Sequence, residues 1–403
     1  MVIIGLIGKA NVGKSTFFNA ATELAVPAAN YPFTTVNPNV GVAFVRTNCV
    51  CREFGVQDNP VHSLCIDGVR FAPVKLIDVA GLVPGAHAGK GLGNKFLDDA
   101  RQADVLIHVV DASGSTDANG KPVPHGSGDP MFDINFVEEE FELWLASIVS
   151  RDWGKAVRDS ESQGLKLEQM LTKRLSGLSI SEPTIAASVH ASGLAMKKPI
   201  LWDEHDIRSF CAVLRKKAKP FIVAANKADL PTSDNNIEKM RSNGLTVIPC
   251  ASEAESLLRK ASKKGVLHYL PGDSSFSLSK EGASSLNEAQ KRALEIVMAI
   301  LKKFGSTGVQ QAINSAVLET LKMIAVYPVE DEVRLSDKKG NVLPDVRLLP
   351  AGSTAKQLAE SVHAELAKGF LYAIDARTKQ RVGADHPLKD RDVIKIVSAT
   401  SRG

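Results

Sequence analysis

Short apolar runs alternate with helix-type segments through the N-terminal part of the chain. The run at residues 2–7 ends in a glycine-rich turn, and helical spacing follows from Lys14, which predicts strand, loop and helix. Further continuous runs of this kind lie at residues 73–79, 105–110, 221–225 and 245–249. Such runs are typical of strands buried on both faces, whereas residues 40–45 predict an edge strand. We therefore expect an α/β fold, a mostly parallel sheet with helices on both faces.

The interval between Asp111 and Asn226 is much longer than the about 30 to 40 residues that one helix and its connections need. It opens with a stretch rich in Gly, Pro and Ser, residues 113–130, which predicts an exposed, mobile loop. Amphipathic helical patterns follow at residues 135–149, 165–175 and 207–217. We expect a helical insertion here, which serves either as a docking arm or as a solvated decoration.

Helical patterns return after the interval and give way to short β-type runs near residue 324. Ser285 and Glu288 have the spacing of a capping box before a helix that ends near Lys303, and residues 309–323 predict a second helix. The β-type runs are residues 325–327, 342–344, 370–374 and 393–397, around one helix at 353–367. This pattern predicts a small α+β domain of about 80 residues. The expected domains are residues 1–134 with 218–323, the insertion 135–217, and 324–403.

Composition adds little to this picture. The chain has 403 residues, enough for two to three domains of usual size, with a formal net charge of +4 and 23% charged residues. This balance indicates neither a nucleic-acid-coating protein nor an acidic solvating one. No apolar run approaches the about 20 residues of a membrane span, so we expect a cytoplasmic protein without an anchor. We also expect a monomer.

The five cysteines are sparse and lack the regular spacing of a disulfide framework, which is typical of a reducing compartment. They are Cys49, Cys51, Cys65, Cys211 and Cys250. The first three could bind a metal, but a C-x-C without a second pair is a weak metal motif. Buried small hydrophobic side chains are the alternative that the pattern favours.

A phosphate-binding motif, Gly8-x-x-x-x-Gly13-Lys14-Ser15, stands between the first expected strand and helix. Glycines let backbone N–H groups converge on phosphate oxygens, and the helix N-terminus favours negative charge. Lys14 would bridge the β- and γ-phosphates and Ser15 would bind Mg²⁺. The alternative is a glycine-rich turn with an incidental Lys-Ser pair. Expected nucleotide contacts are Gly8, Asn11, Val12, Gly13, Lys14, Ser15 and Thr16.

A second motif, Asp78-Val79-Ala80-Gly81, ends the expected strand at residues 73–79. A carboxylate there can hold the Mg²⁺ shell, and the Gly81 amide can sense the γ-phosphate. An aspartate at a strand end could instead cap a helix. The position relative to Lys14 favours the metal role.

A third motif, Asn226-Lys227-Ala228-Asp229, ends another expected strand. The Asp229 carboxylate can accept the N1 and N2 hydrogens that guanine has and adenine lacks, and Lys227 would pack along the base. The Ser252 amide, next to Ala251, is the candidate contact for the base oxygen. Together the three motifs predict a P-loop GTPase that binds GTP and GDP with Mg²⁺.

With these motifs in place, the sequence resembles the Obg family of translation-associated GTPases, in the archaeal form of its YchF-like subfamily. The most specific stretches are residues 30–41, 78–87 and 89–97. The resemblance implies that Thr35 closes on Mg²⁺ and that residues 78–94 contain the second switch. Residues 369–374 resemble a TGS domain, so a β-grasp fold is implied from about Ile324 onwards.

The resemblance also implies a partner, the ribosome or another RNA-containing translation complex. Asn11 matches the position that ligates potassium in cation-dependent relatives, with a purely loop-shaping role as the alternative. Leu82 stands where Ras-like enzymes carry a water-orienting glutamine, so slow intrinsic hydrolysis is expected, on the order of 10⁻⁴ s⁻¹. His87 and His108 are candidates to position water, although His108 also fits a buried core position.

Two departures from the family pattern bear on the base. YchF-like proteins of bacteria and eukaryotes carry Asn-x-x-Glu and favour ATP, whereas Asp229 here predicts GTP; an ATP-preferring ATPase stays an alternative. The common Ser-Ala pair is replaced by Ala251-Ser252.

Three functions are open at this point. The leading one is a GTP-driven switch. The second is an RNA- or ribosome-binding module for which the nucleotide is a structural ligand. The third, a P-loop kinase, is disfavoured by the guanine motif. Arg377, Lys379 and Arg381 could contact phosphate, with a solvated turn as the alternative.

Overall fold

The computed structural model describes residues 1–23, 39–79, 99–178 and 180–399. The strands are β1 (Ile3–Ile7), β2 (Val40–Asn48), β3 (Leu64–Ile66), β4 (Val69–Asp78), β5 (Val105–Asp111), β6 (Phe221–Asn226), β7 (Val247–Pro249), β8 (Leu267–His268), β9 (Ser277–Leu278), β10 (Met323–Val329), β11 (Arg347–Pro350), β12 (Phe370–Asp375), β13 (Arg381–Val382) and β14 (Val393–Ser398). The helices are α1 (Lys14–Thr22), α2 (Cys51–Phe54), α4 (Pro130–Ser150), α5 (Trp153–Ser162), α6 (Leu167–Arg174), α7 (Glu182–Ala191), α8 (Glu204–Ala218), α9 (Ser233–Ser242), α10 (Ser252–Lys263), α11 (Lys280–Ser285), α12 (Glu288–Phe304), α13 (Val309–Asn314), α14 (Ala355–Val362) and α15 (Ala364–Lys368).

The larger sheet has the strand order β2-β4-β1-β5-β6-β7, with β3 paired to β4. β1, β5, β6 and β7 are parallel neighbours, with Ile7 opposite His108 and Asp111 opposite Asn226. The predicted parallel α/β fold is confirmed, and β2 lies at the sheet edge as expected. Because parallel strands end at one edge, the polar residues that follow them gather there.

The antiparallel strand β3 was not predicted from the sequence. Asp67 and Gly68 connect it to β4, and both have positive φ, 52° and 74°. An Asp-Gly pair in this conformation is typical of a two-residue hairpin turn. This local signal was present in the sequence, although the run at residues 64–66 is too short to show a period.

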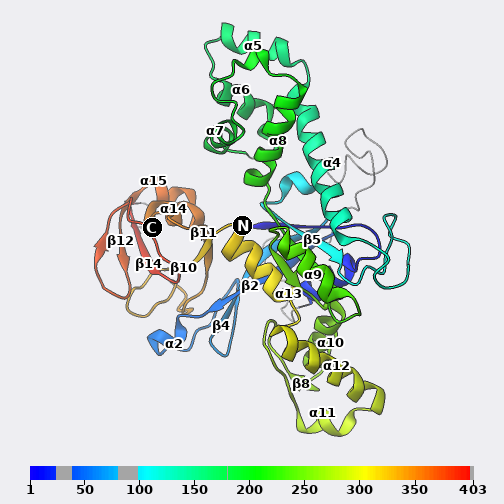
Figure 1. Cartoon of the computed structure of the whole chain (residues 1–403). Helices are drawn as coiled ribbons and strands as arrows, with labels where there is room; N and C mark the ends of the chain where they lie inside the picture. The colour runs from blue at the N-terminus through cyan, green and yellow to red at the C-terminus, as the bar shows by residue number, and fades with distance from the viewer. Residues whose placement is uncertain (24–38, 80–98, 179, 400–403) are drawn as a thin grey trace. The chain divides into compact units, whose positions relative to one another are not determined.

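The insertion is helical, as predicted, and contains α4 to α8. α4 begins at Pro130, before the expected residue 135, because the Asp129 side chain accepts a hydrogen bond from the Met131 N–H and proline suits the first turn. α4 and α8 pack along each other, joined by Arg215 of α8, which binds Glu142 at 3.0 Å. α5, α6 and α7 gather at the end of this pair that lies away from the sheet (Figure 1).

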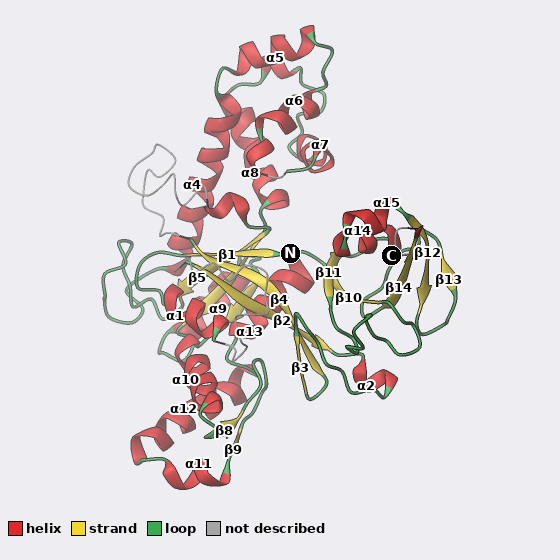
Figure 2. Cartoon of the chain, turned by 180° about the vertical axis from the view of Figure 1, so that it is seen from behind, coloured by secondary structure: helices red, strands yellow, loops and turns green. Residues whose placement is uncertain are grey.

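The C-terminal sheet has the order β11-β10-β14-β12-β13, and α14 lies against it (Figure 2). The expected single helix at 353–367 is wrong, because an extended residue, His363, separates α14 from α15. The expected strand at 342–344 is also wrong. Leu343 has a positive φ of 45°, and the extended segment that pairs with β10 is β11.

Two further expectations before this sheet need correction. The capping box of α12 is formed by Asn287 and Gln290, which exchange hydrogen bonds of 2.9 and 3.0 Å, and not by Ser285 and Glu288. The helix expected at 309–323 changes after α13 into a π-helical turn, Ser315–Thr320, and β10 begins at Met323.

The chain divides into two compact units. One consists of residues 3–23 and 76–312, and it holds the three nucleotide motifs, the insertion and α9 to α12. The other consists of residues 1–2, 24–75 and 313–403. It contains the C-terminal sheet together with α2, β3 and β2, although β2 and β3 are strands of the larger sheet. None of the helices in the described ranges is both long and apolar enough to cross a membrane.

Candidate nucleotide-binding site

The phosphate loop connects β1 to α1 and requires glycine at two points. Gly8 has φ +154°, and a Cβ there would lie 2.5 Å from the Val109 carbonyl oxygen. Gly13 has φ +89°, and a Cβ there would lie 2.2 Å from Asn226 Nδ2. Any larger residue would therefore push the loop away from the sheet.

The predicted phosphate contacts line a single pocket of about 400 Å³. Its lining is Gly8, Lys9, Ala10, Asn11, Gly13, Lys14, Ser15 and Thr16. Val12 is the exception among the predicted residues, because its side chain is fully buried.

Lys14 brings the second motif to this pocket. Its ammonium group donates hydrogen bonds to Asp78 Oδ1 and, at 2.8 Å, to the Val79 carbonyl oxygen. Asp78 is the last residue of β4, and its carboxylate therefore lies at the phosphate loop, where Ser15 follows Lys14 in the first turn of α1. The predicted lysine therefore contacts one metal-ligand candidate, Asp78, and is the chain neighbour of the other, Ser15.

Asn226 joins the base motif to the phosphate loop. Its Nδ2 donates to the Val12 carbonyl oxygen at 2.9 Å, and its Oδ1 accepts from Ser252 N at 3.1 Å and Ser252 Oγ at 2.8 Å. The Asn226 side chain is only 3% exposed, so these bonds are shielded from water. One carboxamide therefore fixes the relative position of three loops that are far apart in the sequence.

The loop that carries Ala251 and Ser252 is held from its other side as well. Ala251 N donates to the Thr307 carbonyl oxygen at 2.8 Å, and Thr307 Oγ1 binds the buried carboxylate of Glu255. Tyr269 donates to the same carboxylate at 2.6 Å. These contacts hold the loop that carries Ser252, whose amide N–H, the candidate base-oxygen contact, is donated to Asn226 Oδ1 in this structure.

Asp111, at the end of β5, is a site residue that the sequence analysis did not identify. It is 1% exposed, receives hydrogen bonds from Ser113, Ser115 and Thr116, and accepts from Lys227 Nζ at 2.8 Å. Burial raises the pKa of this carboxyl, but the bonds from Lys227 and the serines outweigh it and leave the pKa below its ordinary value. Asp111 therefore stays ionised and positions Lys227.

The loop expected to be mobile, residues 113–130, is anchored to the phosphate loop. Asn11 Nδ2 donates to the Gly120 carbonyl oxygen at 2.9 Å, and Lys9 Nζ donates to the Asp117 carbonyl oxygen at 2.7 Å and binds Asp133. Residues 113–130 supply backbone carbonyl oxygens to these contacts, and the polar side chains come from the phosphate loop. The sequence signal for a structured loop was Asp111, a polar residue at the end of a buried strand, because its carboxylate accepts hydrogen bonds from Ser115 and Thr116 of this loop.

Several predicted residues have no described contacts. Thr35, Gly81 and His87, together with Leu82, lie outside the described residues. Asp229 is exposed, as a residue that meets a ligand at the surface would be.

His108 is fully buried in β5, which supports the core alternative over a water-positioning role. Within the described parts of the chain, neither ring nitrogen has a hydrogen-bond partner. Burial, with a smaller contribution from the positive charge of Lys9, lowers the pKa of His108 from 6.5 to about 3. A neutral, enclosed imidazole cannot reach a water at the γ-phosphate.

We expect His108 to make the protein acid-sensitive. The folded-state pKa lies below the unfolded one, so unfolding takes up a proton and stability falls as the pH drops from about 6.5 towards 3. Between pH 7 and pH 5 the wild type should lose about 2 kcal/mol of unfolding free energy that a His108→Leu variant retains. Urea unfolding of both proteins at pH 7 and pH 5 measures these free energies. If the free-energy difference between wild type and His108→Leu is the same at both pH values, the prediction is wrong.

Comparison with known proteins places these features in a family. Three family profiles match: the 50S ribosome-binding GTPase profile over residues 3–127, the G4 motif-containing domain of the Obg-like GTPase YGR210-like group over residues 224–331, and the TGS domain over residues 338–398. Together they cover the phosphate loop, the base motif and the C-terminal sheet.

Relatives match over most of the chain. It is 49% identical over 401 residues to the uncharacterized GTP-binding protein MJ1332 of Methanocaldococcus jannaschii, covering 99% of this chain and 100% of that protein. The crystal structure of a GTP-binding protein from Pyrococcus horikoshii OT3 is 39% identical, with a TM-score of 0.78 over 99% of this chain and 100% of that one. The ribosome-binding ATPase YchF of Mycoplasma pneumoniae is 32% identical over 243 residues, 59% of this chain and 60% of that protein. This chain belongs to the YchF-like branch of the Obg family of P-loop GTPases and carries a C-terminal TGS domain.

Proposed function

We propose that the protein hydrolyses GTP to GDP and phosphate and acts as a nucleotide-dependent switch on the ribosome. The observation that carries the nucleotide-hydrolysis assignment is the side chain of Asn226, which ties the base motif to the phosphate loop, and the choice of GTP rests on Asp229. A base that pairs correctly with Asp229 is then held in a fixed relation to Lys14. Binding energy gained at the base can therefore position the γ-phosphate for reaction.

Lys14, Ser15 and Asp78 support a magnesium-assisted hydrolysis. The hydroxyl of Ser15 and the carboxylate of Asp78 are hard oxygen donors at one end of the phosphate loop, and Thr35 is the third ligand that we assign. When bound, Mg²⁺ neutralises charge that develops on the β- and γ-phosphates. Lys14 contributes its own positive charge there, and the Gly81 amide is assigned to the γ-phosphate.

The remaining catalytic positions follow from the same site. We assign a potassium ion to the carboxamide oxygen of Asn11, whose nitrogen is held by Gly120. His87 is the remaining candidate to orient water, because His108 is enclosed. With Leu82 in place of a glutamine, intrinsic hydrolysis is slow, and a partner accelerates it by up to about 10⁵-fold.

The ribosome assignment comes from the names of relatives and of a matching family profile. Phosphate contact by the TGS-domain residues Arg377, Lys379 and Arg381 stays a prediction, and each of these side chains has a partner within the protein. Arg377 binds Glu53 at 3.0 Å, and Arg381 lies over the Tyr372 ring at 4.5 Å. The surface that meets RNA is therefore not assigned to these residues.

Co-sedimentation with ribosomes of the native organism tests the switch. The full chain is mixed with purified ribosomes and Mg²⁺, with either GDP or a non-hydrolysable GTP analogue, and the bound fraction is measured. We expect stronger binding with the analogue and faster GTP hydrolysis when ribosomes are added. Ribosome binding that is equal with both nucleotides would favour the alternative, in which the nucleotide is a structural ligand, and absent binding would reject the partner.

A further inference from the structure

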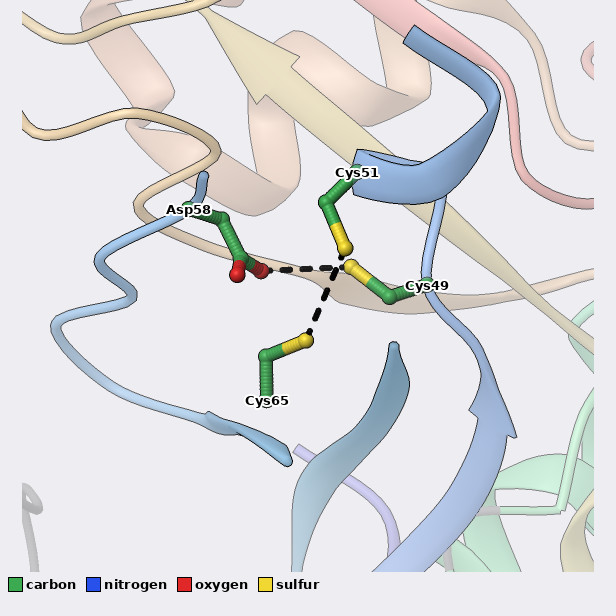
Figure 3. Close-up of side chains that lie close together, drawn as sticks. All are labelled: Cys49, Cys51, Asp58 and Cys65. Carbon is green, nitrogen blue, oxygen red and sulfur yellow. Dashed lines mark hydrogen bonds between the residues drawn. The ribbon is translucent and has the colours of Figure 1, made fainter. Parts of the chain in front are cut away.

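Three cysteines and an aspartate that belong to none of the three nucleotide motifs converge at one place. Cys49 follows β2, Cys51 begins α2, Cys65 lies in β3, and Asp58 lies in the loop between α2 and β3. Their side chains point towards one another (Figure 3), and the three sulfurs and a carboxylate oxygen all lie within 4.8 Å of one another. Such a group goes beyond the packing role that the sequence favoured for these cysteines.

The spacing of the ligand atoms matches a tetrahedral zinc site. Zinc–sulfur bonds near 2.3 Å place two sulfurs at adjacent corners of a tetrahedron about 3.8 Å apart. Cys51 Sγ and Cys65 Sγ are 3.8 Å apart, and Cys49 Sγ is 3.2 Å from Asp58 Oδ2. Thiolate with one carboxylate is also a ligand set that selects zinc over magnesium or calcium, which prefer oxygen alone.

A buried arginine supports the same site from behind. Arg70 of β4 is fully buried, and its Nη2 donates to Asp58 Oδ2 at 2.7 Å and to Cys49 Sγ at 3.4 Å. Outer donors of this kind orient metal-bound carboxylates and thiolates. Zinc with three thiolates and one carboxylate carries two excess negative charges, and the guanidinium offsets one of them.

We propose that Cys49, Cys51, Cys65 and Asp58 bind one zinc ion. Cys49 and Cys51 are buried and the other two ligands are half-buried, so four protein ligands surround the ion without an open position. This coordination is that of a structural zinc and not of a catalytic one.

The zinc would fix the loop between α2 and β3, which also contacts the C-terminal part of the same unit. Asn59 N donates to the Val342 carbonyl oxygen at 3.1 Å, and Val61 N donates to the Pro344 carbonyl oxygen at 2.8 Å. Arg70 continues this connection, since its Nη2 also binds the Leu343 carbonyl oxygen at 3.1 Å. The ion would thus fix the loop between α2 and β3, which is hydrogen-bonded to residues 342–344.

Metal analysis of the full chain tests the proposal. The untagged protein is purified with a reductant and without chelators, and zinc is measured by elemental mass spectrometry. We expect about one zinc per chain, and less than about a tenth of that in Cys51→Ser/Cys65→Ser. Cys211→Ser is the control, because Cys211 is also a buried free cysteine but lies in α8, and this variant should keep its zinc.

Cobalt substitution gives a second measurement that does not depend on a folded double variant. The wild-type chain, stripped by a chelator and reloaded with Co²⁺, should develop a sulfur-to-cobalt charge-transfer band and the intense visible bands of a tetrahedral centre. Asp58→Ala should alter the visible bands and keep the sulfur band. The proposal is overturned if wild-type protein binds neither zinc nor cobalt, or if the cysteine variant binds as much metal as the wild type. A Cys51–Cys65 disulfide in protein whose thiols are blocked by alkylation directly after cell lysis would also overturn it.

Discussion

Replacing Asp229 with alanine should reduce the preference of the protein for GTP over ATP by about 10⁴-fold. In the proposed function the Asp229 carboxylate would accept two hydrogens that guanine presents and adenine does not, so its removal would eliminate the contact that distinguishes the bases. The phosphate loop is supported by Asn226 and not by Asp229, so the triphosphate should still bind. Dissociation constants for GTP, GDP and ATP, measured by titration calorimetry for wild type and variant, give the ratio.

Two controls keep this result specific to the base. Asp234→Ala removes a nearby exposed aspartate whose partner is Lys303 and should leave the ratio unchanged. Asp229→Glu keeps the charge but places it farther from the backbone and should shift preference towards ATP. A wild-type chain that preferred ATP would refute the assignment of residues 226–229 to guanine.

Replacing Lys14 with alanine should slow GTP hydrolysis by about 10²- to 10³-fold, the usual cost of losing one preorganised electrostatic contact in a transition state. The Lys14 ammonium group lies between Asp78 and the Val79 carbonyl oxygen, at the end of the phosphate loop where negative charge develops. Single-turnover hydrolysis at saturating GTP and Mg²⁺ measures the chemical step separately from binding.

The matched control for this variant is Lys239→Ala. Lys239 is exposed on α9 and binds Asp129 at 3.1 Å, so its loss removes one positive charge without touching the phosphate loop. Its single-turnover rate should equal that of the wild type. A Lys14→Ala protein that binds GTP and hydrolyses it at the wild-type rate would contradict the role assigned to this lysine.

The individual strands along the chain and the nucleotide motifs could be predicted because each depends on local sequence. A continuous apolar run such as residues 105–110 predicts a buried strand by itself. Gly8 and Gly13 indicate a turn with positive φ angles, which other residues rarely adopt. The errors fell where competing local signals are similar. Ser285 and Asn287 both suit a helix N-cap, and the side chain that caps α12 is Asn287.

The sequence by itself determined that this chain is a P-loop GTPase with a helical insertion and a small C-terminal β domain. Only the tertiary structure decided that Asn226 bridges Val12 and Ser252, that Asp111 holds Lys227, and that His108 is enclosed. The same holds for the cluster of Cys49, Cys51, Asp58 and Cys65. The physical reason is that these contacts depend on which strands become neighbours and on how side chains turn within the core. Residue types and their spacing do not determine which strands become neighbours or which way a core side chain turns, because packing between segments distant in the chain sets both.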